Sequence, residues 1–212
     1  MIRSPLCVIS LLVTFATCLG SASSARADRY DPPGRLRLLG GAHFGIGGSL
    51  EGDRFPFDGE YDLATTYGGH VGVDAVVFRF FAIGGEVRAA AFNTEEAERR
   101  NIDRSFLVDI DVKPRLRIPF ARQRFELYFS TPVGLTIPVL SDDISADGRV
   151  DGKPGWNLGL GGGMTFFFTE HFGLNLEPMY VMRWFGVEGP GGTELDLKMR
   201  QFTLFTNAVI AF

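Results

Sequence analysis

The stretch from Arg104 to Ile118, RSFLVDIDVKPRLRI, constrains the fold more than any other part of the chain. Its even positions from Phe106 onward are all apolar, and its odd positions from Asp109 to Arg117 are all charged. This period of two predicts a β-strand with one apolar and one ionic face. The strand is longer than the 5–6 residues or so that are usual in soluble domains. A soluble β-sandwich could turn the ionic face to water, whereas a membrane barrel would turn the apolar face to lipid.

The first residues predict a secretory signal peptide. Arg3 precedes a largely apolar run from Leu6 to Leu19, and SASSARA follows with a small-residue cleavage motif at Ala25-Arg26-Ala27. A charged start, a short apolar run and a cleavage motif are typical of exported proteins. The run is shorter than the ~20 residues that span a bilayer as a helix. We therefore expect residues 1–27 to be the signal peptide and residues 28–212 to form one barrel domain.

Two alternatives apply to this segment. It could remain as an uncleaved anchor, or the chain could be a lipoprotein that is cleaved before Cys18. The residues Phe15-Ala16-Thr17 match the usual lipoprotein pattern poorly. Both cysteines, Cys7 and Cys18, lie within the segment, so the exported part has no disulfide although its compartment permits them. A closed sheet would supply the missing stability.

Charge argues against nucleic acid as a partner. Without Arg3 and Arg26, 19 basic residues face 25 acidic ones, a net charge of −6, and no basic block remains. No later apolar run is long enough for a membrane helix. If the protein enters a membrane, it does so with strands.

The same alternation recurs along the chain and predicts eight strands. The connections between them alternate between long and short, as in outer-membrane barrels with short periplasmic turns and long extracellular loops. Residues 48–62, 93–103, 141–155 and 186–196 are the predicted long loops, and the segment TEEAERR in the second of these could form a helical turn. An even number of strands returns the C-terminus to the periplasmic side. The predicted strands cover residues 35–47, 64–77, 81–92, 104–118, 125–137, 156–167, 172–185 and 197–212.

Aromatic residues gather at both ends of these strands and predict two girdles at the membrane interfaces. Near the short turns lie Phe78, Phe80, Phe81, Phe120, Phe125, Phe167, Phe168 and Phe172, and near the long loops lie Tyr61, Tyr67, Phe92, Trp156, Trp184 and Phe185. Prolines inside predicted strands each remove a ladder donor and are expected at bulges or strand ends; they are Pro114, Pro132, Pro138 and Pro178.

The last strand, QFTLFTNAVIAF, places Phe202, Leu204, Thr206, Ala208, Ile210 and Phe212 on one face. This resembles the C-terminal signature of bacterial outer-membrane barrels, which ends in Phe and is recognised during assembly. Residues 28–212 as a whole resemble the small eight-stranded class, such as the transmembrane domain of outer-membrane protein A. The resemblance implies an all-β, antiparallel up-and-down transmembrane barrel in the outer membrane. It also implies contact with outer-membrane lipid and with the barrel assembly machinery through Phe212. A secreted β-sandwich is the alternative.

In the barrel frame the charged faces point inward. The inward set from the second to the seventh predicted strand is close to neutral, which favours a paired network, because unpaired ions in a confined interior are costly. Such a network could plug the barrel or form a narrow ion pathway, but an eight-stranded interior leaves no room for a wide pore. The predicted network comprises Asp74, Glu86, Arg88, Asp109, Asp111, Lys113, Arg115, Arg117, Glu126, Glu177 and Arg183.

Small inward residues on two opposite strands could leave part of the barrel interior unfilled. Gly68 and Gly72 lie on the second predicted strand, and Gly159, Gly161 and Gly163 lie on the sixth. We hypothesise that long side chains of the third and fourth strands lean into this space. Otherwise a slot would remain for water or a small ligand.

The residues give little support for catalysis or for a metal site. The three histidines are His43, His70 and His171, and no His-x-Ser arrangement matches the outer-membrane lipid hydrolases. Asp143, Ser145, Asp147 and Asp151 approximate the start of a calcium loop, but Pro154 replaces the expected Glu, so a solvated acidic loop is the favoured interpretation. We expect no cofactor, no enzyme activity and a monomer.

The sequence therefore predicts a non-catalytic outer-membrane barrel with an ion-paired interior. Its role would be structural support of the envelope or surface contact through its loops. The alternative is a narrow channel or a carrier for small or hydrophobic solutes.

Overall fold

The computed structural model describes residues 34–52, 59–100, 102–120, 124–140, 151–188, 192 and 194–212. The chain divides into two units, residues 1–31 and residues 32–212. The signal peptide expected at residues 1–27 lies outside the described residues. No helix in the described part of the chain is long and apolar enough to cross a membrane.

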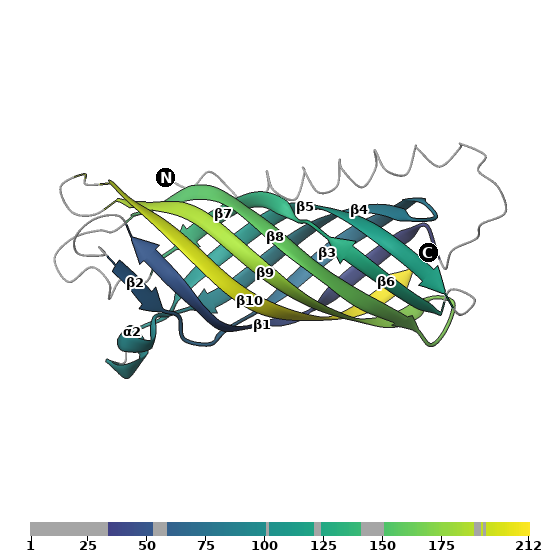
Figure 1. Ribbon diagram of the computed structural model, residues 1–212, viewed down its shortest axis with the longest axis horizontal. Coiled ribbons are helices and arrows are strands. Elements are labelled where there is room, and N and C mark those ends of the chain that lie inside the picture. Colours follow the sequence, from purple (N-terminus) through teal and green to yellow (C-terminus); the bar gives the residue numbers. More distant parts are fainter. Residues whose placement is uncertain are drawn as a thin grey trace. The chain divides into compact units, whose positions relative to one another are not determined.

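The second unit is a single antiparallel sheet that closes into a barrel (Figure 1). A short helix, α2 (Glu95–Arg99), begins at Thr94, whose hydroxyl accepts a hydrogen bond from the Ala97 amide. It lies with β2 at the end opposite to the C-terminus (Figure 1). The described strands are β1 (Leu36–Gly52), β2 (Gly59–Asp62), β3 (Thr66–Phe78), β4 (Phe81–Phe92), β5 (Ser105–Phe120), β6 (Phe125–Ser130), β7 (Val133–Val139), β8 (Asp151–Phe167), β9 (Phe172–Glu188) and β10 (Glu194–Ala211).

Nine of these segments form a wall of eight strands, as the alternation predicts. β1 pairs with β10 from Arg37↔Ala211 to Glu51↔Lys198, which closes the ring. β6 and β7 are two halves of one wall strand, since both pair with β5 and with β8. The break between them falls at Thr131 and Pro132, because proline cannot donate to the ladder. β2 is a short extra strand that pairs only with the end of β1. The prediction of an eight-stranded up-and-down barrel is confirmed.

The long connections are shorter than the sequence predicts. β1 continues into the loop predicted at residues 48–62 and ends at Gly52. β8, β9 and β10 likewise extend into the loops predicted at 141–155 and 186–196. In β1 the cause is a bulge: Gly47 and Gly48 have φ of 61° and 131°, and the register with β10 shifts there. Positive φ favours glycine, and pairs of glycines are also common in turns. The sequence therefore suggests a turn at Gly47 and Gly48, although the strand continues beyond them.

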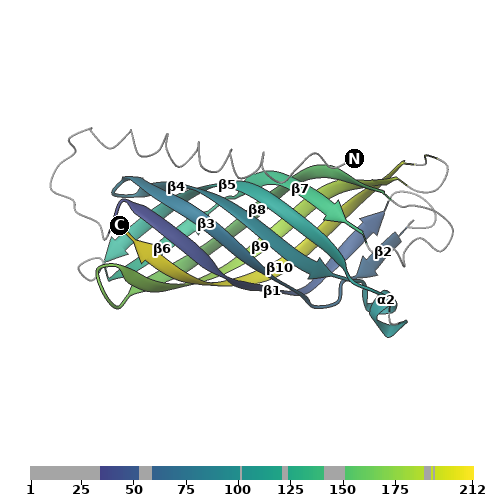
Figure 2. The same cartoon turned by 180° about the vertical axis from the view of Figure 1, so that it is seen from behind.

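Large apolar side chains cover the outside of the wall. Strand positions that alternate with the buried ones are exposed, for example Phe44, Val71, Leu116, Leu135 and Leu174. So extensive an apolar exterior is not stable in water, whereas a lipid bilayer covers it. The charged alternation of β5 therefore faces inward, and the strands run obliquely around the barrel (Figure 2).

Three aromatic residues expected in the girdles instead point inward. Phe92 and Phe185 lie in a buried apolar cluster at the long-connection end, and Phe167 lies in a second cluster near the short turns. The prediction was wrong for these residues because both faces of a strand become apolar near its ends, where a period of two cannot assign the inward side. We call the first group the upper apolar layer: Leu50, Leu63, Phe92, Leu107, Phe185, Val187, Leu197 and Met199.

Candidate functional site

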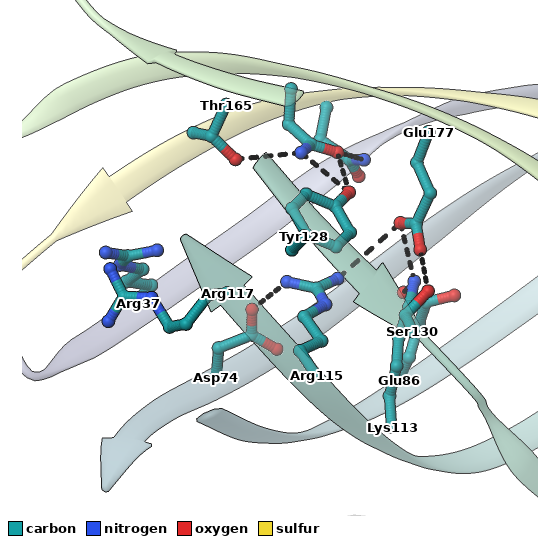
Figure 3. A network of polar contacts seen from close by, with 12 residues as sticks. Arg37, Asp74, Glu86, Lys113, Arg115, Arg117, Tyr128, Ser130, Thr165 and Glu177 are labelled. Carbon is teal, nitrogen blue, oxygen red and sulfur yellow. Dashed lines mark hydrogen bonds and ion pairs between the residues drawn. The ribbon is translucent and has the colours of Figure 1, made fainter. Parts of the chain in front are cut away.

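The interior of the barrel, or lumen, holds the candidate site. The structure places all eleven predicted charged residues on inward positions, where each is buried, and adds Arg37 of β1. Six basic side chains thus face six acidic ones: Arg37, Arg88, Lys113, Arg115, Arg117 and Arg183 against Asp74, Glu86, Asp109, Asp111, Glu126 and Glu177. The network is neutral as a whole, and Figure 3 shows its central part.

At the short-turn end, Arg37 and Glu126 join opposite walls. Arg37 donates from Nη1 to Oε1 of Glu126 at 3.0 Å and from Nη2 to Oε2 at 3.1 Å. Arg117 donates to the same carboxylate. Four positions separate β1 from β6 in the eight-membered ring, so this bidentate pair spans the lumen. Such paired, charge-assisted bonds also fix the geometry of both side chains.

In the middle of the lumen, Lys113 is the hub. Its Nζ lies 2.9 Å from Oε2 of Glu86 on β4 and 2.8 Å from Oε2 of Glu177 on β9 (Figure 3). Arg115 pairs with Asp74 and lies 3.6 Å from Glu177. The side chain of Lys113 is only 1% exposed. A buried ammonium of this kind is stable only because two carboxylates face it.

Towards the long-connection end, two arginines share one aspartate. Nη2 of Arg88 lies 2.6 Å from Asp111 and 3.3 Å from Asp109. Nη2 of Arg183 lies 2.8 Å from Asp109, which also accepts a hydrogen bond from the Thr136 hydroxyl at 2.6 Å. β4, β5, β7 and β9 are thereby linked across the interior. Above this level the upper apolar layer fills the inward positions.

The glycine-lined space of β8 is filled, but by residues that differ from our hypothesis. A Cβ at Gly161 would lie 2.9 Å from Cβ of Met179, and one at Gly159 would lie 2.6 Å from Cγ of Pro132. Tyr128 of β6 lies against Gly163 in the same way. Neighbouring strands therefore supply most of the filling. From β4, Arg88 reaches Asn157 of β8 at 3.4 Å.

Arg37 and a histidine cluster are the main features that sequence reasoning missed. Arg37 could have been found, since it alternates with Leu36 and Leu38, but the inward set excluded the first strand. His43 and His70 lie 5.6 Å apart between ring centroids, and each ring lies 5.2 Å from Phe205. His70 also contacts Asn207. These contacts join β1, β3 and β10, and no pattern within one strand reveals them.

The remaining candidate residues lie elsewhere. His171 is exposed in the short turn after β8, with Nδ1 3.1 Å from the Ala211 carbonyl. Of the possible calcium ligands, Asp143, Ser145 and Asp147 lie outside the described residues, and Asp151 begins β8 opposite Glu188. Within the described ranges, no group of three or more His, Cys, Asp or Glu side chains could hold a metal ion.

No protein-family model and no curated protein matches the chain, but solved structures do. Outer membrane protein OprG from Pseudomonas aeruginosa is 10% identical, with a TM-score of 0.59 over 86% of this chain and 99% of that one. Outer membrane protein AlkL is 16% identical, with a TM-score of 0.55 over 90% and 96%. Neisserial surface protein A is 11% identical, with a TM-score of 0.53 over 84% and 97%. The chain thus has the fold of small outer-membrane β-barrels, and its apolar exterior fits a lipid bilayer.

Proposed function

We propose that this protein is a non-catalytic, closed barrel that supports the outer membrane and presents its long connections to the outside. The observation that supports a closed barrel is the network around Lys113. Its cation and both of its carboxylate partners are almost completely buried. A lumen that conducts ions would need water along the same path.

Charge balance supports the same proposal. Among the described residues, six basic and six acidic side chains lie inside, so together they give the lumen no net charge that would attract either anions or cations. An ion passing through would have to displace the bonds between Arg37 and Glu126, which reach across the lumen. Breaking buried ion pairs of this kind costs about 3–5 kcal/mol each.

A second candidate is a carrier for small hydrophobic solutes. The observation that favours it is the upper apolar layer, in which eight buried apolar side chains occupy inward positions at the long-connection end. Tyr61 and Leu140 pack against them. An apolar solute could displace some of these side chains without breaking an ion pair.

Channel recording tests the proposal. Refolded protein in planar bilayers should show no unitary conductance, and the same sample must first show heat-modifiable gel mobility, which demonstrates a folded barrel. Conductance that persists after trimming of residues 53–58 and 141–150 would contradict a closed barrel and support a channel. Loss of binding to cells or envelope components on the same trimming would support a surface role. Saturable binding of an alkane or fatty acid within the lumen would support the carrier.

The apolar exterior of the barrel implies contact with lipid. Contact with the barrel assembly machinery is part of our proposal. Phe212, which is exposed at the end of the last strand, is proposed as the assembly signal. Ring closure pairs β1 with β10, so the described wall strands leave no open seam that calls for a second copy, and we propose a monomer. No nucleic acid is expected as a partner.

A further inference from the structure

Four outward side chains on four neighbouring strands form a row on the outside of the wall. Trp156 of β8 pairs with Trp184 of β9, Trp184 pairs with Lys198 of β10, and Lys198 pairs with Glu51 of β1. The two indole rings stack with centroids 3.9 Å apart and planes 12° apart. Nζ of Lys198 lies 5.8 Å from the Trp184 ring centroid. We call this set the tryptophan row.

A hollow of about 550 Å³ lies along this row. Its lining includes all four residues of the row, together with Gly186 and Asp196 of the next outward level. Gly186 contributes no side chain, and β8 is bulged between Lys153 and Trp156, so a gap remains above the two rings. Trp156 is 49% exposed. An aromatic surface beside carboxylates and an amine is therefore accessible from outside.

The tryptophan row marks the edge of the apolar belt. On the short-turn side, the adjacent outward level contains Leu158, Met182, Arg200 and Ser49. The level beyond it contains Ile46, Leu160, Tyr180 and Phe202, all exposed. On the long-connection side they present charged residues, among them Asp151, Glu188 and Glu194. Tryptophan prefers this boundary, where its ring is in contact with acyl chains and its N–H is in contact with polar groups. The hollow therefore lies at the level of the lipid headgroups.

The charges around the hollow decide which headgroup fits. Two of the three basic residues are already paired, Arg200 with Glu51 at 3.0 Å and Lys153 with Glu188 at 3.1 Å. From the level of Arg200 to the long-connection end, the four strands carry five acidic and three basic outward side chains. These are Glu51, Asp151, Glu188, Glu194 and Asp196 against Lys153, Lys198 and Arg200. The excess of negative charge disfavours a phosphate group.

A neutral sugar satisfies these conditions. Its C–H face can cover an indole ring, and its hydroxyl groups can donate to carboxylates such as Asp196 and Glu51. A membrane-tethered sugar also reaches the headgroup level at a lower cost in translational freedom than a free sugar, because its acyl chains already lie against the belt. We propose that the tryptophan row binds the neutral saccharide headgroup of a glycolipid in the outer leaflet. This inference is independent of whether the lumen conducts.

Intrinsic fluorescence can test the site directly, because Trp156 and Trp184 are the two tryptophans of the whole chain. The refolded protein is placed in phosphatidylcholine vesicles that contain increasing amounts of diglucosyl diacylglycerol. We expect a saturable change in tryptophan emission. The same titration with phosphatidylglycerol, which has no sugar and is anionic, should leave the emission unchanged. Equal responses to both lipids, or no response to the glycolipid, would overturn the proposal.

Two variants make the result specific. Asp196→Asn keeps both tryptophans and should weaken the glycolipid response at least tenfold, whereas Glu95→Gln on α2 should leave it unchanged. Heat-modifiable mobility shows that each variant is folded. Maltose in solution distinguishes the source: if it saturates the response at the same sugar concentration as the lipid, the site takes free saccharide and the membrane-tethered ligand is refuted. An unchanged response in Asp196→Asn would refute the carboxylate's role in binding.

Discussion

Removal of the Lys113 side-chain charge is the most direct perturbation of the lumen. In Lys113→Met the aliphatic stem is retained, but Glu86 and Glu177 lose a partner at 2.9 and 2.8 Å. Removing one member of a buried ion pair typically costs about 3–5 kcal/mol. Glu177 retains the hydroxyl of Ser130 and the guanidinium of Arg115 at 3.6 Å, so we expect the lower end of this range, about 3 kcal/mol.

Urea unfolding of the refolded barrel, followed by heat-modifiable mobility, measures this loss. With a slope of about 2 kcal/mol per molar urea, the midpoint should fall by about 1.5 M. Arg99→Met on α2 is the matched control: its side chain is 78% exposed in an ion pair with Glu95, so its effect should stay below about 0.5 kcal/mol. Adding Glu177→Gln to Lys113→Met should recover part of the loss, because an uncharged amide is less costly to bury. If Lys113→Met unfolds at the same urea concentration as Arg99→Met, the lumen is hydrated and the closed-barrel reasoning fails.

Three further predictions concern other parts of the barrel. Arg37→Met should destabilise the barrel in the same urea assay by about 2 kcal/mol, less than Lys113→Met, because Glu126 keeps Arg117; an unchanged midpoint would show that the cross-lumen bond is not formed. Gly161→Trp should lower the refolding yield without altering conductance, because Met179 already occupies the space, whereas Gly40→Trp on the outward face should refold normally. A change of conductance in Gly161→Trp would reveal an open slot. Phe212→Ala should reduce the heat-modifiable fraction in cells but not the yield of refolding into detergent, and an equal loss in both would indicate a structural role instead.

Most of the wall could be predicted from the sequence because the inward and outward faces of each strand follow from the residues of that strand alone. In β5, alternation over one continuous segment assigns each side chain to lipid or to lumen, and the structure agrees from Phe106 to Ile118. The same rule fails where local chemistry changes. Gly47 and Gly48 read as a turn, yet β1 continues beyond them as a bulged strand. Pro132 divides one wall strand into β6 and β7, which the pattern treats as continuous.

The pairing inside the lumen could be predicted only in part. Alternation shows that Lys113 points inward, but its partner Glu177 belongs to a strand three positions away in the ring. Which residues meet depends on strand stagger and side-chain length, and neither is encoded in a single segment. The upper apolar layer was missed for a related reason. At Leu107 and Phe185 the residues on both faces of the strand are apolar, so alternation does not show which face points into the lumen.

The seam between β1 and β10 has a consequence for how the protein forms. It joins Arg37 to Ala211, residues from the two extremes of the described chain. Long-range pairing of this kind makes folding slow, because the entropy of closing the chain is lost before the contacts form. Until the final strand is delivered, the first strand exposes a row of unpaired amides and carbonyls. Loss of residues 201–212 would remove most of β10, and the sheet would then have two unpaired edges in place of the closed seam.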